Sequence, residues 1–307
     1  MTDPAIIVAR FAQYLGAVIL LGAPLFFLYA RAEAGSVRLE ASRRRLLLAA
    51  AALLALSSLM AIVLQSALFT GSLAEGLKME NLGAVATGMA LGKAALVRAG
   101  AAGAAFVLLL LLSPGPLSWI GTAALGLVAT VGLAWMGHGA AGEGPTGWIQ
   151  LTADILHLIA AAVWIGALLG LLKLLVVRPQ TEAAADTARS ALERFSGIGS
   201  AIVAVLLLTG VINGWVLIGP DRLDSLWTSP YGRLLLLKVL LFGGMLVLAA
   251  SNRFRLTPGL GKALHSGEET GAALGALRRS IALELALGIA ILALVAWLGV
   301  LAPPASA

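Results

Sequence analysis

The stretch that decides the fold runs from Trp135 to Gly166 and reads WMGHGAAGEGPTGWIQLTADILHLIAAAVWIG. It contains two of the chain's three histidines, His138 and His157, on either side of a short glycine-rich loop. Apolar segments long enough to cross a membrane flank this loop, and an ionisable side chain at the edge of a membrane span is costly to place. We therefore interpret the stretch as a hairpin between two membrane helices that carries a functional site.

The composition indicates an integral membrane protein. Hydrophobic residues make up 60% of the 307 positions and charged residues 12%, about half the charged fraction of soluble domains. The absence of cysteine excludes disulfides and thiolate metal sites, so His, Met, carboxylates or backbone would have to hold any metal. The net charge of +6 comes from short loops between apolar segments, which predicts contact with the lipid bilayer and no nucleic-acid partner. No nucleotide motif is present, and we expect no enzymatic activity.

Hydropathy predicts an all-α, polytopic membrane protein with eight transmembrane helices in a single domain, 1–307. The turn Ser113–Pro116 separates the third segment from the fourth, which would otherwise form one overlong run. We expect the first segment to be a membrane helix and not a cleaved signal peptide. The predicted spans are Ala5–Ala30, Arg45–Thr70, Val85–Leu112, Leu117–Gly137, Leu151–Val177, Phe195–Gly219, Tyr231–Ser251 and Ser280–Leu301.

The distribution of basic residues predicts the orientation. Three loops on one side of the predicted membrane hold most of the 21 Lys and Arg, whereas the opposite loops between helices hold only Lys78 and Arg222. Basic loops stay in the cytoplasm, so we expect both termini, His138 and His157 on the periplasmic side and His265 on the cytoplasmic side. The basic residues that set this bias are Arg31, Arg38, Arg43, Arg44, Arg45, Lys173, Arg178, Arg189, Arg194, Arg253, Arg255, Lys262, Arg278 and Arg279.

The sequence also predicts an internal 4+4 repeat with halves of about 1–138 and 150–307. Gly92, Lys93 and Arg98 match Gly232, Arg233 and Lys238, and the run Ala134–Gly137 matches Ala296–Gly299. Placing Gly22 over Gly166 puts Gln13 over His157. Because four helices is an even number, the halves would be parallel and related by an axis along the membrane normal. Neither Gln13 nor Val300, the counterpart of His138, could replace an imidazole, so we expect one metal site and not two.

The candidate ligands surround the hairpin. Asp154, His157 and Trp164 are spaced to share one face of a helix, where Asp154 could bond the second ring nitrogen of His157. Met136 precedes His138 by two residues, and imidazole with thioether suits copper. The alternative is that each histidine bonds a loop carbonyl. The two imidazoles would meet only if the fifth helix began near Thr152, or if the fourth helix ended lower than its neighbours, because His157 lies about 13 Å below Trp148.

Several further motifs accompany the run from His157 to Gly166, which reads HLIAAAVWIG. Together they make the chain resemble the copper resistance protein D family almost from end to end. The HLxAAxxWxG pattern is the most specific of them. Each of the other motifs is weak evidence alone, and together, in this order along the chain, they are strong evidence. They are Gly137-His138-Gly139-Ala140, Thr209-Gly210-Val211-Ile212-Asn213, Tyr231-Gly232-Arg233 with Lys238, Asn252-Arg253 with Pro258, Arg278-Arg279 with Glu284, and Pro303-Pro304.

The resemblance implies a multi-pass bacterial inner-membrane protein of copper homeostasis, which takes copper from the periplasm and moves it inward. Some relatives carry a fused periplasmic CopC domain; this chain has none, so we expect a separate CopC-like partner. The predicted metal ligands are His138 and His157, with Asp154 or Met136 in support. Trp164, Lys238, Glu284 and Asn213 are candidates for a structural role or for the copper pathway. Two alternatives are a haem-binding b-type redox protein with axial histidines and a scaffold that presents copper without transporting it.

Overall fold

The computed structural model of the protein describes residues 3–29, 37–137, 140, 142–177, 182–266 and 270–306, and this part of the chain is helical and free of strands. Short elements join the long helices: 3-10 turns η1 (Leu133–Met136), η2 (Pro220–Arg222) and η4 (Pro304–Ser306), and a π-helical turn η3 (Asn252–Leu256). The α-helices are α1 Asp3–Tyr29, α2 Val37–Thr70, α3 Leu73–Gly76, α4 Met79–Gly88, α5 Ala90–Leu111, α6 Pro116–Gly132, α7 Gly144–Val177, α8 Glu182–Ile218, α9 Ser225–Thr228, α10 Pro230–Ser251, α11 Thr257–Ser266 and α12 Thr270–Leu298.

Eight of the described helices are long and apolar enough to cross a membrane, which confirms the predicted all-α, eight-span class. They are α1, α2, α5, α6, α7, α8, α10 with its continuation into α11, and α12. Several begin one to three turns earlier than hydropathy indicates, α7 at Gly144 and α12 at Thr270 among them. The early part of α12 is rich in Ala, Leu and Arg, which favour helix. The early part of α7 contains Pro145, which the first turn of a helix accepts.

The predicted third span is interrupted near its start. Met89 has an extended backbone, so α4 and α5 are separate helices that fold against each other. Gly92 allows this close approach, because a Cβ at that position would overlap the carbonyl of Val85. The apolar run from Val85 to Leu112 is therefore not one straight helix.

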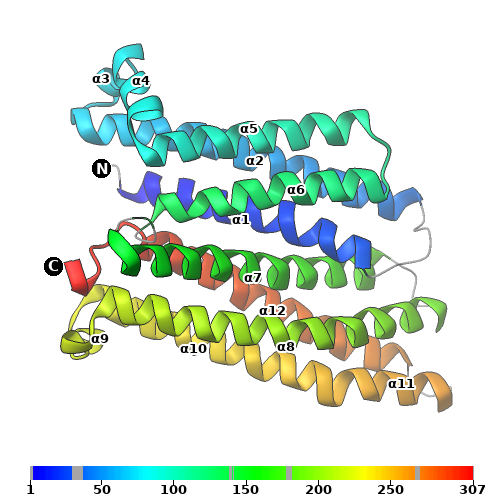
Figure 1. The fold of residues 1–307 in the computed structure, drawn as a ribbon. Coiled ribbons are helices and arrows are strands. Elements are labelled where there is room, and N and C mark those ends of the chain that lie inside the picture. Colours follow the sequence, from blue (N-terminus) through cyan, green and yellow to red (C-terminus); the bar gives the residue numbers. More distant parts are fainter. Residues whose placement is uncertain are drawn as a thin grey trace.

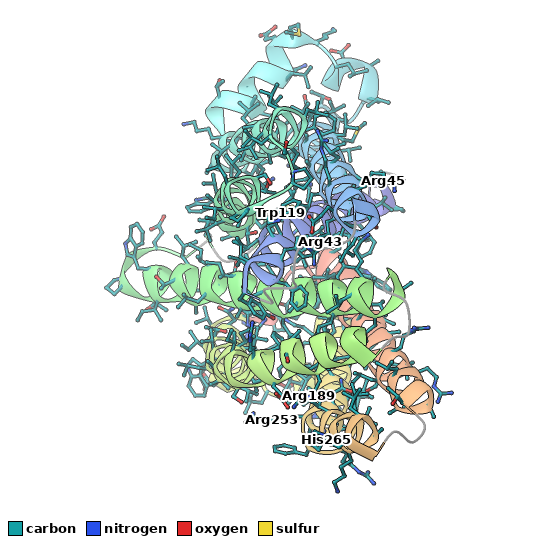
Figure 2. All side chains as sticks on the ribbon, turned by 90° about the vertical axis from the view of Figure 1, so that its right-hand side faces the viewer. Arg43, Arg45, Trp119, Arg189, Arg253 and His265 are labelled. Carbon is teal, nitrogen blue, oxygen red and sulfur yellow. The ribbon has the colours of Figure 1, made fainter. Side chains whose placement is uncertain are left out.

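The spans form a layered bundle with a central group of four (Figure 1). Helices α1, α6, α7 and α12 pack together at the centre, with α2 and α5 along one edge and α8 and α10 along the other. Both termini and α9 lie at one end of the bundle, and α11 lies at the opposite end. Figure 2 looks onto that opposite end, where Arg43, Arg45, Arg189, Arg253 and His265 gather. The basic residues labelled there thus share one end of the bundle, as the loop count predicted, while Arg31 and Arg178 of that count lie outside the described residues.

The central helices α1 and α7 cross at Gly22 and Gly166. A Cβ on Gly22 would overlap the carbonyl of Ala162, and a Cβ on Gly166 would overlap the backbone of Gly22. The repeat predicts that these two glycines occupy equivalent positions in the two halves. Equivalent positions contact each other where the axis that relates the halves passes between them. Gly126 also approaches the backbone of Leu20 and Leu21 on α1, whereas its counterpart Gly288 approaches the side chain of Ile165 on α7, the counterpart of Leu21. These contacts are the ones that a parallel repeat would produce; the repeat itself stays a prediction.

The two halves differ in how their second and third spans pack. In the first half α2 packs along α5, but in the second half α8 and α10 contact each other only sparsely. Helix α8 is held instead by α7 and α11, and α10 by α12. Cavities therefore form in the second half, between α7, α8, α10 and α12.

Candidate functional site

His157 and Asp154 line a cavity of about 170 Å³ at the end of the bundle where the termini lie. We call it the outer cavity. Helix α7 places both side chains on one face because they are three residues apart. Residues from α1, α8, α10 and α12 complete the wall. The polar or charged side chains of this wall are Arg10, Tyr14, Gln150, Asp154, His157, Asn213, Tyr231 and Lys238.

Thr209 on α8 fixes the orientation of the His157 ring. The ring nitrogen Nδ1 lies 2.9 Å from Thr209 Oγ1, and this hydroxyl lies 2.6 Å from the carbonyl oxygen of Val205. A hydroxyl carries one proton. If Thr209 donates it to Val205, its oxygen accepts from the Nδ1–H of His157, and Nε2 keeps a lone pair. This is the tautomer that binds a metal through Nε2, with the other nitrogen held by a neighbouring group.

The outer cavity holds charges of both signs. The carboxylate of Asp154 and the ammonium of Lys238 line it together and attract each other. Arg10, 8% exposed, donates from Nη1 to the carbonyl oxygen of Met136 over 2.8 Å, while its Nε and Nη2 have no hydrogen-bond partner among the described residues. Asn213 adds a side-chain oxygen, Oδ1, which also has no partner there. A cation that enters this cavity meets one carboxylate and one oriented imidazole, and competes with Lys238.

His138 lies outside the described residues, but its neighbours bear on the predicted pair of histidines. Helix α7 begins at Gly144, so a start near Thr152 is wrong. Helix α6 ends at Gly132 and continues as the η1 turn, and Gly137 lines the outer cavity together with His157. The chain thus reaches the wall of the His157 cavity one residue before His138. Among the described residues, no three His, Asp or Glu side chains come together as a metal site.

Met136 lines a different cavity, of about 60 Å³, with Gln13 and Arg98. Arg10 lines both cavities and bonds the carbonyl oxygen of Met136. Under the predicted repeat, this small cavity is the counterpart of the outer cavity. Its Arg10, Gln13 and Arg98 then stand where the outer cavity has Asp154, His157 and Lys238. Two cations and an amide thus replace the carboxylate, imidazole and ammonium of the outer cavity, and the single outer site stays a prediction.

A middle cavity of about 280 Å³ continues from the outer one between α8 and α10. His157 and Lys238 line both cavities, and the rest of the middle wall is mostly apolar. Trp164, only 3% exposed, lines its far side. The indole is held edge-on against Phe242, with ring centroids 5.9 Å apart.

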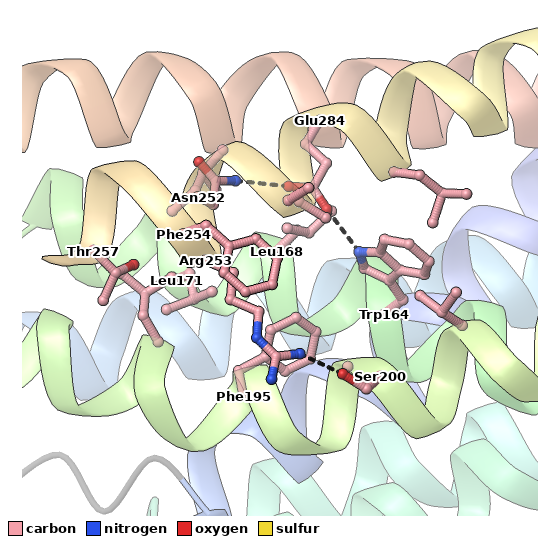
Figure 3. A pocket seen from close by; sticks show the side chains of 17 residues that line it. Trp164, Leu168, Leu171, Phe195, Ser200, Asn252, Arg253, Phe254, Thr257 and Glu284 are labelled. Atoms are coloured by element: carbon pink, nitrogen blue, oxygen red, sulfur yellow. Dashed lines mark hydrogen bonds between the residues drawn. The ribbon is translucent and has the colours of Figure 1, made fainter.

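Beyond Trp164 lies a third cavity, of about 290 Å³, toward the basic end of the bundle; we call it the inner cavity (Figure 3). Glu284 and Asn252 line it together with Trp164, which is the residue that it shares with the middle cavity. Trp164 Nε1 donates to Glu284 Oε1 over 2.8 Å, and Asn252 Nδ2 donates to Glu284 Oε2 over 2.9 Å. Lys238, Trp164 and Glu284, the candidates for a structural or pathway role, therefore line the outer, middle and inner cavities in that order.

Three side chains of this arrangement were not predicted as site residues. Thr209 and Asn252 belong to short motifs, and each motif gave no reason to prefer one residue over its neighbours. Arg10 gave a stronger signal, since it is a charge within the first apolar segment, and such charges mark functional or packing sites.

Comparison with known proteins places the chain in a family. The family model "Copper resistance protein D-like, N-terminal domain" matches residues 1–148, and the model "Copper resistance protein D" matches residues 189–298. Copper resistance protein D of Pseudomonas syringae pv. tomato is 38% identical over 309 residues, which cover 99% of this chain and 98% of that protein. No solved structure matches the chain.

Two further relatives match in part. Inner membrane protein YebZ of Escherichia coli is 39% identical over 130 residues, 41% of this chain and 42% of that protein. Copper transport protein CutJ of Bacillus subtilis is 35% identical over 162 residues, 52% of this chain and 26% of that protein. With a relative matched along almost its whole length and family models on both halves, the chain belongs to the copper resistance protein D family.

Proposed function

We propose that the protein binds copper in the outer cavity and moves it across the inner membrane. The observation that carries the proposal is the ring of His157, which Thr209 orients so that Nε2 can bind a metal, in a cavity shared with the carboxylate of Asp154. His138 is the second proposed ligand, because Gly137 lines the same cavity. Asp154 is the supporting group that this arrangement favours, since the side chain of Met136 lines the neighbouring cavity.

The series of cavities supports transport over mere presentation of copper. A scaffold needs only the outer cavity, whereas here two further cavities continue toward the opposite end of the bundle. Trp164 is the barrier between the last two, and passage of an ion requires that its indole move away from Glu284. In the proposed orientation the outer cavity faces the periplasm, where a CopC-like protein would supply copper.

Two measurements on one purified preparation test the proposal. Metal analysis after copper loading and desalting should give one copper per chain, and proteoliposomes should exchange internal copper for external isotope. Stoichiometric copper without exchange would indicate a presenting scaffold. A Soret absorption band with no retained copper would indicate the haem alternative.

A further inference from the structure

Glu284 is a buried carboxyl group without a cationic partner among the residues that the structure describes. It is 1% exposed, and it is the one acidic side chain among the fully buried residues of the described part. Neither of its hydrogen-bond donors, Trp164 and Asn252, carries a charge. An isolated ionised carboxylate in such a place is strongly destabilising. The group is therefore stable as a neutral acid, or as an anion once a cation reaches the inner cavity.

The inner cavity around Glu284 contains few other charged groups. Helices α7, α8, α10, α11 and α12 and the η3 turn line the inner cavity, and apart from Glu284 its charged side chain is Arg253. The Arg253 guanidinium donates to Ser200 on α8 and stacks over the ring of Phe254. Trp164, Thr257 and Asn252 are the other polar groups in the wall, and none of them titrates in the ordinary range.

Asn252 can serve both states of the carboxyl group. As placed, its Nδ2 donates to Glu284, which suits the anion, and its Oδ1 is buried with no partner among the described residues. A rotation of the amide by 180° exchanges the two atoms. Oδ1 would then accept the O–H of a protonated Glu284. One side chain thus satisfies the carboxyl group whether or not it carries a proton.

We propose that Glu284 is a site in the inner cavity where copper displaces a proton. Before copper arrives, Glu284 holds a proton; when a copper ion passes Trp164, the O–H bond breaks. The proton leaves to water at the basic end, and the carboxylate binds the cation with the Asn252 side-chain oxygen. Release of copper restores the proton. This inference rests on the proposed function, because it needs copper to enter the cavity.

The test is the number of protons released when copper chloride is added to the full-length, detergent-purified protein in weakly buffered solution. The variant Glu284→Gln keeps the shape of the group. Its amide can accept from Trp164 and donate to a rotated Asn252, so we expect it to fold. With copper chloride in enough excess to load the inner cavity as well as the tighter outer site, we expect wild type to release about one more proton per chain than Glu284→Gln. Glu193→Gln, an exposed acid on α8 that pairs with Arg189, is the matched control and should behave as wild type.

Equal proton release by wild type and Glu284→Gln, at equal copper binding, would overturn the inference and leave the proposed function standing. Wild type that binds no copper would overturn both. If Glu284→Gln fails to fold, a measurement on wild type alone still tests the inference. Infrared difference spectra should show the carbonyl stretch of a buried carboxylic acid, and this band should disappear on copper loading. The band should shift in Glu284→Asp. Its persistence with copper bound would contradict the proposal.

Discussion

His157 and Thr209 form the contact that gives the outer cavity its chemistry: Nδ1 of His157 lies 2.9 Å from Oγ1 of Thr209 across the interface of α7 and α8. The contact does two things. It holds the ring in one orientation, and it leaves the lone pair on Nε2. The sharpest predictions concern this pair and its charged neighbours.

Thr209→Val removes the hydroxyl and keeps the shape of the side chain. We expect copper affinity to fall about 10–100-fold, which is typical for loss of a group that orients a metal-bound histidine. Thr209→Ser should retain most of the affinity. Thr130→Val is the matched control, because Thr130 is also buried and also donates to the carbonyl four residues earlier, that of Gly126, but its hydroxyl is not bonded to His157. Copper titration with a competing chelator measures all three, and unchanged affinity in Thr209→Val would argue against the assigned tautomer.

The two proposed ligands should be indispensable. His157→Ala and His138→Ala should each abolish stoichiometric copper binding and copper-dependent growth phenotypes. His265→Ala should do neither, since His265 is exposed on α11 and bonds the carbonyl of Gly261. Inductively coupled plasma analysis of the purified variants gives the copper content. Full copper occupancy in the His138→Ala, His157→Ala double variant would refute the site.

Lys238→Met should strengthen copper binding in the outer cavity. Lys238 shares this cavity with Asp154 and His157, so its positive charge opposes that of the metal. Two like charges 4 Å apart at an effective dielectric constant of about 20 repel by about 4 kcal/mol. We expect a gain of at least tenfold, which corresponds to about 1.4 kcal/mol. Lys93→Met, an exposed lysine on α5, serves as the control. Weaker binding in Lys238→Met would mean that Lys238 supports the site and does not compete with copper.

The crossing of α1 and α7 should tolerate no side chain at Gly22. A Cβ there overlaps the backbone carbonyl of Ala162, which cannot rotate away, so Gly22→Ala should destabilise the protein by about 1–3 kcal/mol. Gly103→Ala on α5 is the contrasting variant, because nothing lies within 4 Å of its added Cβ. It should be neutral or stabilising, since alanine favours helix over glycine. Thermal unfolding in detergent compares the two variants, and equal melting temperatures would contradict the close crossing.

The orientation can be tested with single thiols because the chain has no cysteine. Glu143→Cys lies at the end where the termini are, and Lys262→Cys lies at the basic end; both positions are exposed. A membrane-impermeant maleimide added to intact spheroplasts should label Glu143→Cys, and should label Lys262→Cys only after lysis. Reversed labelling would place the outer cavity in the cytoplasm and exclude uptake from the periplasm through it.

The sequence by itself determined the eight spans, the end at which the basic residues gather, and the shared face of Asp154, His157 and Trp164. Each of these depends on local properties: the length of an apolar run, the bias of loop charge and the period of a helix. The ends of the helices were not predictable from hydropathy. Helix α7 begins at Gly144 and not at Leu151, and Pro145 fits there because the first turn of a helix needs no N–H from it.

Only the tertiary structure decided which residues from distant helices meet. Thr209 approaches His157, and Trp164 bonds Glu284 across 120 residues of sequence. The tertiary structure also decided that α8 and α10 stay apart, so that the middle and inner cavities form in the second half. The physical reason is that helix faces rich in Gly, Ala and Leu can pack in several ways with similar energies. Close approaches such as that of Gly22 to Gly166 select one packing, and they act between segments whose separation in sequence carries no signal.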